Sequence, residues 1–186
     1  MSVGKSAIEK HGISKKRRSS VVKASQEDSR VAQSSAAEYV VIQRVSKPHG
    51  ADIFKQIVSG KPMAGFAAVK VIREGYPAQV LKAASSFLGV SDARIQTIAQ
   101  VPATTASRLE KNQSKIDSAA TERVYRMGTV TRMAIEVFAD KDSAIEWMRR
   151  PNRALGDAAP LDLMDTEPGA VAVRQVLNAI ETGGVA

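Results

Sequence analysis

Apolar residues recur at helical spacing along most of the chain, and glycine and proline separate the segments that carry them. The segment 64–74 is followed by Gly75, and the next segment begins at Pro77 and runs through apolar Leu88 to Gly89. Proline is favoured in the first turn of a helix and glycine directly after the last turn. Both segments are therefore predicted helices.

Two shorter helices are predicted next, with a brief interruption between them. Ser91 is a suitable N-cap for the first, and Val101 and Pro102 interrupt the pattern before the second. Two short helices over 91–100 and 103–111, joined by a tight turn, match the layout of a helix-turn-helix, whose second helix lies in the DNA major groove. Helical hairpins that never touch DNA share this layout, so both interpretations stand. The polar positions of the second helix that would meet base edges and phosphates are Thr104, Thr105, Ser107, Arg108 and Lys111.

A longer helix is predicted from Asp117 or Ser118, since either side chain can accept a hydrogen bond from an unpaired N-terminal amide. We expect Arg123, Arg126 and Arg132 to face outward, as charged residues on a helix usually do. The opposite face makes this the central core helix, with apolar residues at spacings of three and four: Ala120, Val124, Met127, Val130, Ala134 and Phe138.

The last third of the chain alternates apolar segments with helix-breaking residues. Pro151 ends a helix that contains Trp147, Asn152 and Gly156 shape a tight loop, and Pro160 starts a short helical turn. Trp147 is either a core residue or an interface residue. A final helix is predicted to end at Gly183-Gly184 and to carry, on one face, Ala170, Val173, Val176, Leu177 and Ile180.

The N-terminal segment shows no such pattern. Its first 35 residues are rich in Ser, Lys and Arg, with a basic cluster at 15–18, and hold too few apolar residues to compensate for the entropy of ordering. We expect a flexible arm that either attaches to DNA without specificity or is a solvated tail. The β-branched run 39–45 is either a short strand or an extended segment, and the compact region is expected to begin near residue 51.

Composition favours an all-α fold, because aromatic residues make up only 4% of the 186 while 44% are hydrophobic. We predict a flexible basic arm over 1–50, a helix-turn-helix region over 51–115 and a small helical domain over 116–186. Net charge changes along the chain. Residues 1–47 carry ten Lys and Arg against four Asp and Glu, residues 48–139 carry twelve against seven, and residues 140–186 carry five against eight. The basic front suits a phosphate backbone, whereas the acidic last third needs another explanation.

The residues give little support for an enzyme. There is no cysteine, His11 and His49 lie outside the predicted core, and no spacing suggests metal ligands or a glycine-rich phosphate loop. We therefore assign no catalytic residue, cofactor or metal. We also expect a cytoplasmic protein, because no apolar run is long enough to span a bilayer and no secretory signal is recognisable.

Residues 81–183 resemble the Xre/MbcA/ParS-type antitoxins, which join an Xre-like helix-turn-helix to a C-terminal toxin-binding domain. The resemblance is carried by the 144–147 pattern, then Pro151-Asn152, Leu155-Gly156, Pro160-Leu161 with Leu163, Thr166, Gly169, and finally Val173, Leu177, Ile180 and Gly183. One departure concerns the turn Gln100-Val101-Pro102, which lacks the glycine common in this family, and the second helix of the pair holds only two basic residues.

The resemblance implies a dimeric antitoxin that blocks the active-site cleft of a RES-domain toxin, an NAD-depleting enzyme, and that often represses its own operon by binding operator DNA. It makes 116–186 the toxin-binding domain. An acidic surface and a small C-terminal tail would suit a positive cleft that holds the pyrophosphate of NAD. The candidate toxin contacts are Asn152, Arg153, Arg174, Asn178, Glu181, Gly183 and Gly184. The alternative is a DNA-binding transcriptional regulator or nucleoid-type protein without a toxin, which explains the basic front but not the last third.

Overall fold

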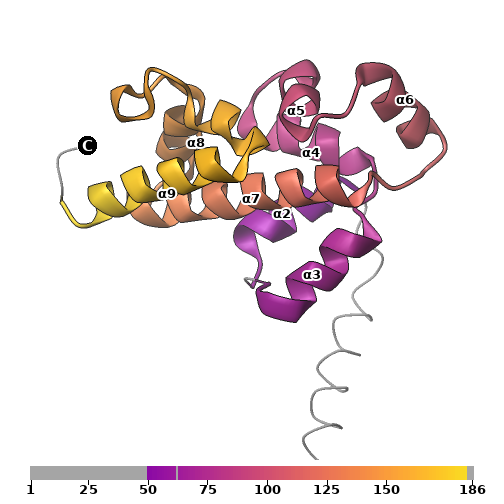
Figure 1. Ribbon diagram of the computed structural model, residues 1–186, viewed down its shortest axis with the longest axis horizontal. Coiled ribbons are helices and arrows are strands. Elements are labelled where there is room, and N and C mark those ends of the chain that lie inside the picture. Colours follow the sequence, from indigo (N-terminus) through magenta and orange to yellow (C-terminus); the bar gives the residue numbers. More distant parts are fainter. Residues whose placement is uncertain (1–49, 62, 184–186) are drawn as a thin grey trace, which may run out of the picture. The chain divides into compact units, whose positions relative to one another are not determined.

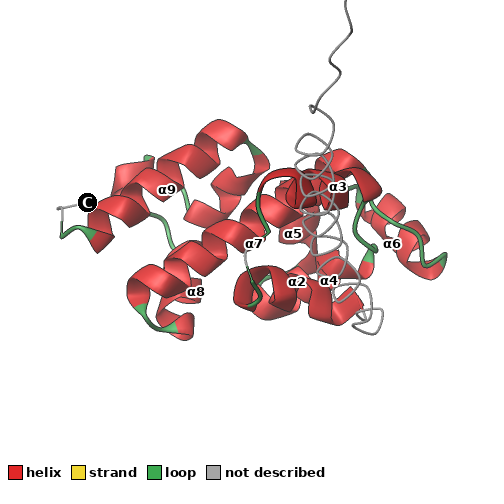
Figure 2. Cartoon of the chain, turned by 90° about the horizontal axis from the view of Figure 1, so that it is seen from below, coloured by secondary structure: helices red, strands yellow, loops and turns green. Residues whose placement is uncertain are grey.

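The structure is a computed structural model that describes residues 50–61 and 63–183. Every regular element in these ranges is helical, which confirms the all-α prediction, and short loops join the helices (Figure 2). The basic cluster at 15–18 and the run 39–45 lie outside the described residues. The elements are α2 (Gly50–Ser59), α3 (Gly65–Glu74), α4 (Gln79–Leu88), α5 (Asp92–Ala99), α6 (Ala103–Lys111), α7 (Ser118–Phe138), α8 (Lys141–Arg149), the 3-10 helices η1 (Arg153–Leu155) and η2 (Pro160–Asp165), and α9 (Glu167–Glu181).

Helix α7 is the centre of the described unit, because α2, α3, α8, α9 and η2 all pack against it (Figure 1). Its predicted apolar face is buried from Ala120 to Ala134, and Phe138 is half-buried against Trp147, with 5.6 Å between ring centroids. Burial of each large apolar side chain contributes about 1.5–3 kcal/mol. The open choice of N-cap is resolved in favour of Asp117, whose carboxylate accepts the Ala120 amide at 2.7 Å.

Helix α2 has no counterpart among the predicted helices. Its buried residues are Ile53, Phe54, Ile57 and Val58. These residues follow one another at spacings of one, three and one, and this helical periodicity was the signal for α2 in the sequence. The helix packs between α4 and α7, and Phe54 meets Phe87 of α4 edge to face at 5.6 Å between centroids.

The prediction that all three α7 arginines face outward is wrong for Arg126, which is only 8% exposed. Its Nε lies 3.0 Å from Glu122 Oε1 and 3.2 Å from Glu167 Oε2, and its Nη1 donates to the Met164 carbonyl at 3.2 Å. Arg123 and Arg132 are half-buried. The physical reason is that η2 and α9 fold over this face of α7 and bring acceptors that satisfy the buried guanidinium.

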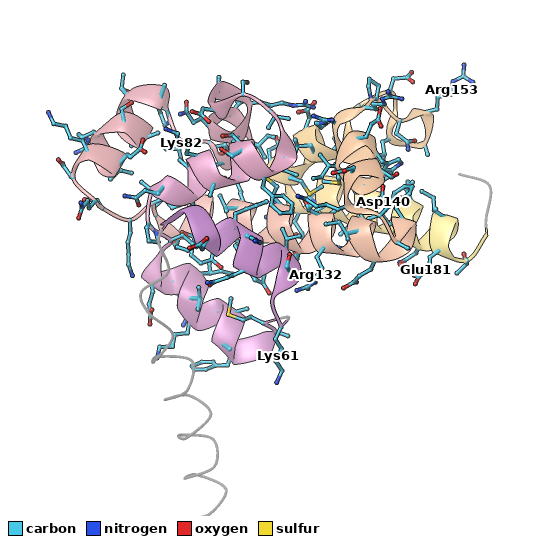
Figure 3. All side chains as sticks on the ribbon, turned by 180° about the vertical axis from the view of Figure 1, so that it is seen from behind. Lys61, Lys82, Arg132, Asp140, Arg153 and Glu181 are labelled. Carbon is cyan, nitrogen blue, oxygen red and sulfur yellow. The ribbon has the colours of Figure 1, made fainter. Side chains whose placement is uncertain are left out.

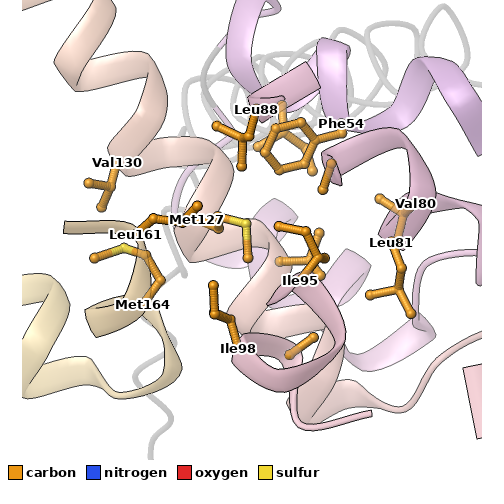
Figure 4. Close-up of a cluster of buried hydrophobic side chains, with 14 of the residues drawn as sticks. Phe54, Val80, Leu81, Leu88, Ile95, Ile98, Met127, Val130, Leu161 and Met164 are labelled. Carbon is orange, nitrogen blue, oxygen red and sulfur yellow. The ribbon is translucent and has the colours of Figure 1, made fainter. Parts of the chain in front are cut away.

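The two predicted helical regions share one hydrophobic core. Ile98 of α5, Met127 of α7, and Leu161 and Met164 of η2 belong to the same buried cluster (Figure 4). The described residues form one compact unit, and α7 runs through it. The boundary predicted between residues 115 and 116 stays a prediction. None of the described helices has both the length and the apolar character needed to cross a bilayer.

Candidate functional site

The turn between α5 and α6 is tight although it contains no glycine. Gln100 takes the left-handed conformation at φ 56°, and the Val101 amide donates to the Gln96 carbonyl at 2.9 Å. This hydrogen bond is typical of a helix C-terminus at which the residue in the left-handed conformation is usually glycine. A residue with a side chain pays about 1 kcal/mol for this conformation. The turn therefore forms although it lacks the glycine that is common in this family.

Four of the five polar residues predicted on the second helix of the pair lie on one stripe of α6. Thr104, Ser107, Arg108 and Lys111 follow one another at spacings of three, one and three residues, and all four are exposed. Thr105 lies beside the stripe and is half-buried. Helix α6 buries Ala106 on the opposite side. DNA contact by these five residues stays a prediction.

The charges on this stripe are available to a ligand. In the part of the chain that the structure describes, neither Arg108 nor Lys111 forms an ion pair or side-chain hydrogen bond. By contrast, Lys115, just beyond α6, is occupied, since its Nζ donates to the Glu74 carbonyl at 3.0 Å. Two unpaired cations on an exposed helix are suited to phosphates.

A shallow hollow of about 400 Å³ lies between α5 and α6. It is lined by Ala93, Gln96, Thr97, Gln100, Val101, Pro102 and Ala103. The lining holds no acid, base or thiol, and its one hydroxyl, that of Thr97, donates to the Ala93 carbonyl at 2.9 Å and has no base beside it in the lining to activate it. Among the described residues there is also no cluster of three potential metal ligands.

The predicted toxin contacts that the structure describes lie at η1 and the residue before it, and along α9 and the glycine after it. Figure 3 shows Arg153 and Glu181 at the same end of the described unit. Arg153 is exposed, whereas Asn152 has a structural role in the loop. Its Oδ1 accepts the Ala154 amide at 2.8 Å, and its own amide donates to the Ala158 carbonyl at 3.0 Å. Gly156, with φ 67°, completes the turn as the loop pattern predicts.

Three further candidates share the outer face of α9. Arg174, Asn178 and Glu181 are separated by four and three residues, and the latter two are exposed. Arg174 is half-buried and forms an ion pair with Glu167. Gly183 follows the helix in a left-handed conformation at φ 73°. Gly184 lies outside the described residues. Toxin contact by these residues stays a prediction.

Three of the eight acidic residues in 140–186 form ion pairs with basic side chains of the described residues. Glu146 pairs with Arg150, Asp162 with Arg94, and Glu167 with both Arg126 and Arg174. Among the described residues Glu181 forms no ion pair. The sequence alone does not show which acids are paired, because the partners of Asp162 and Glu167 include residues of α5 and α7 that are distant along the chain.

Comparison with known proteins assigns a family to each of the two helical regions. Residues 67–127 match the family described as the antitoxin Xre-like helix-turn-helix domain, and residues 133–183 match the antitoxin Xre/MbcA/ParS C-terminal toxin-binding domain. The chain is 31% identical to "Antitoxin Xre" of Photorhabdus laumondii over 114 residues, which is 61% of this chain and 77% of that protein. It belongs to the Xre antitoxin family. Another member, "Antitoxin Xre" of Yersinia enterocolitica, is 28% identical over 120 residues, which is 64% of this chain and 81% of the relative.

As an Xre-family protein, the chain is an antitoxin of a toxin–antitoxin system with a DNA-binding helix-turn-helix. The helix-turn-helix match covers α4, α5 and α6 completely, together with most of α3 and the first part of α7. The toxin-binding match covers α8, η1, η2 and α9. The two matches meet on α7, and neither includes α2.

Proposed function

We propose that this Xre antitoxin neutralises a RES-type, NAD-depleting toxin by inserting the C-terminal end of α9 into the toxin's active-site cleft. The observation that carries the proposal is the position of this end. It lies at the end of the described unit opposite α6, so a toxin bound there leaves the candidate DNA surface accessible (Figure 1). The match of residues 133–183 to a toxin-binding domain supports a toxin partner.

Charge supports the same orientation. A cleft that holds the pyrophosphate of NAD must be electropositive, and complementary charge steers and orients association. Glu181 is exposed at the end of α9 and, within the described residues, is not neutralised by a neighbouring cation. Asn178 and Arg174 extend the polar face one and two turns back along α9.

The first test removes the end of the helix. An antitoxin truncated after Leu177 keeps the fully buried Leu177 side chain and loses Asn178, Glu181 and everything beyond. Co-expressed with the toxin encoded by the neighbouring gene, it should fail to restore growth while its circular dichroism spectrum stays helical. A truncated protein that still neutralises the toxin would refute insertion of this end.

A substitution tests the charge without removing any backbone. Glu181→Lys should weaken neutralisation, because it reverses the charge that meets the positive cleft. Glu110→Lys on α6 is the matched control, since Glu110 is also exposed but lies on the helix-turn-helix, and it should neutralise normally. Equal behaviour of the two variants would show that the acidic end has no special role.

The class of toxin is tested separately by measuring cellular NAD while the toxin is expressed alone. A RES-type enzyme should lower NAD before growth stops, and the antitoxin should prevent both effects. Growth arrest with a normal NAD level, still relieved by the antitoxin, would reject the RES assignment and leave the antitoxin function intact.

We also propose that α6 binds the operator of the toxin–antitoxin genes and represses them in the cytoplasm. Arg108→Ala and Lys111→Ala should each weaken binding to the upstream DNA and lower the slope of log affinity against log salt by about 1 if each contacts a phosphate. Lys82→Ala on α4 is the control. Removing residues 1–47 should lower the slope further if the basic arm contributes. Unchanged slopes in the α6 variants would contradict recognition by this helix.

Helix-turn-helix proteins commonly read two half-sites as symmetric dimers, with one recognition helix in each major groove. We therefore propose that this antitoxin binds its operator as a homodimer. Analytical ultracentrifugation of the free protein and of the operator complex tests the stoichiometry. One protein chain per operator would refute it.

A further inference from the structure

Helix α3 exposes an apolar surface on a rigid support. Of its ten residues only Ala68 is fully buried, while Phe66 is 78% exposed and Val69 is 39% exposed. These two are among the three large hydrophobic residues that the structure shows as exposed in its described ranges, the third being Val171 on α9. A solvent-exposed phenylalanine beside a second apolar side chain is typical of an interaction surface.

Both ends of α3 are fixed to the rest of the protein. The Tyr125 hydroxyl of α7 donates to the Met63 carbonyl just before the helix, and Lys115 Nζ donates to the Glu74 carbonyl at its last residue. The inner face packs against α7. Phe66 is thus presented by an anchored helix, so little conformational entropy would be lost when a partner covers it.

The outer face of α3 consists of Phe66, Val69, Lys70 and Arg73, which recur at spacings of three, one and three residues. At about 100° per residue, Phe66 and Arg73 point in nearly the same direction, and Ala68 points the opposite way into the core. In the described part of the chain the Arg73 guanidinium has no ion pair or hydrogen bond. The face therefore offers an aromatic ring near one end and an unpaired cation near the other.

We infer that this outer face is the contact between two copies of the chain, with the two α3 helices packed antiparallel about a two-fold axis. The axis passes between Val69 and Lys70, which places Phe66 against Arg73 of the partner subunit, and the same contact forms a second time by symmetry. An isologous interface must be complementary to itself, and a ring and a cation at equal distances from the centre satisfy this condition. The guanidinium over the ring is a cation–π contact.

This inference rests on the proposed homodimer and assigns its surface. Competing occupants fit the face less well. DNA would bring phosphates to Arg73 and Lys70 but leave the Phe66 ring without an apolar partner. The match to a toxin-binding domain covers residues 133–183 and does not include α3. A phenylalanine side chain buries 150–250 Å², so two copies and their neighbours form an interface at the small end of the specific range. We expect a dimer that dissociates in the micromolar range.

The test is sedimentation velocity of the full chain over about 1–200 µM, the range that suits so small an interface. Phe66→Arg should raise the dimer dissociation constant at least about tenfold, because it sets two arginines against each other at both contacts. The exchange variant Phe66→Arg with Arg73→Phe restores the ring–cation pair in reversed order and should bring the constant back to within about threefold of wild type. The 78% exposure of Phe66 means that these changes leave the core intact.

Val69→Glu and Val171→Glu form a matched pair, since each valine is 39% exposed on a different helix. The first should weaken the dimer and the second should not. A wild-type chain that stays monomeric over the whole range overturns both the homodimer and its surface, whereas toxin neutralisation by that monomer would leave the antitoxin proposal standing. A wild-type dimer that Phe66→Arg does not weaken overturns the surface alone. Weakening by Phe66→Arg without recovery in the exchange variant overturns the antiparallel pairing.

Discussion

Arg94 on α5 and Asp162 on η2 form a two-point ion pair between residues 68 positions apart in the sequence. Arg94 Nε lies 2.7 Å from Asp162 Oδ1, and Nη2 lies 2.9 Å from Oδ2. The pair joins the first helix of the helix-turn-helix to the turn that leads into α9. A displacement of η2 by a bound toxin would therefore act directly on the helix that precedes α6.

Removing this pair should have a small effect on stability. Asp162→Asn is expected to lower the free energy of unfolding by about 0.5–1 kcal/mol, because the two side chains are 30% and 50% exposed and solvent screens their attraction. Urea denaturation at low and high salt measures the change, which should shrink as salt rises. A double-mutant cycle with Arg94→Met isolates the pair. A coupling energy of zero would show that the contact adds nothing to folding.

The buried guanidinium of Arg126 should contribute much more. Arg126→Met is expected to cost about 2–3 kcal/mol, since it leaves Glu122 and Glu167 close together without their shared cation and the Met164 carbonyl without its donor. Arg126→Lys should fall between the two, because an ammonium lacks the planar fork that reaches all three acceptors. Chemical denaturation checks the order. A methionine variant as stable as wild type would mean that packing alone holds this face together.

Gly128 should not tolerate alanine, although alanine is the better helix former. A Cβ atom at this position would lie 2.5 Å from Ile57 Cγ2, where α2 crosses α7. We expect Gly128→Ala to lower the free energy of unfolding by about 1–3 kcal/mol through overpacking. Combining it with Ile57→Ala should recover part of this loss, so the two changes should not be additive. Strict additivity would refute the close contact of α2 with α7.

Tyr76 should make the protein sensitive to alkali. Burial, with a smaller contribution from Tyr125, raises the pKa of the Tyr76 hydroxyl well above its usual value near 10. The unfolded chain then loses this proton at a lower pH than the folded chain. Stability is fully retained below about pH 10 and is lost as the pH rises from there towards the folded pKa.

Tyr76→Phe should remove that part of the alkaline loss. It should cost little near neutral pH, because the hydroxyl has no hydrogen-bond partner among the described residues. Thermal unfolding at pH 8 and about pH 10.5, for wild type and variant, makes the comparison. The same alkaline loss in wild type and Tyr76→Phe would contradict the role of Tyr76.

Features encoded within a few residues were predictable from the sequence. The stop at Gly89, the cap at Ser91, the break at Pro151 and the apolar face of α7 depend on local geometry, and the structure has them where the sequence predicts them. Arg126 was misplaced because its burial depends on Glu167 and Met164, which follow it by about 40 positions. Spacing on a single helix cannot reveal a second element that folds over it.

The candidate functional surfaces also combine features that local sequence predicts with features that depend on the tertiary arrangement. Of the five polar positions predicted on α6, four are exposed and Thr105 is half-buried. The pairing of Asp162 with Arg94 and of Arg174 with Glu167 required the tertiary arrangement, and it determines which charges are left for a partner. Helix α2 shows a different failure, since Pro48 and Gly50 mark the start of the segment and Ile53 and Phe54 carry part of the apolar spacing, yet no helix was predicted there.

The two family regions meet within α7, so the division between DNA binding and toxin binding falls inside an unbroken helix. A new toxin specificity therefore cannot be acquired by exchanging whole modules at a loop. A hybrid of two Xre antitoxins would have to keep the helical register through residues 128–132 and inherit a matching set of residues that contact η2. Such constraints favour gradual change of the α9 surface over recombination as the route by which these proteins acquire new partners.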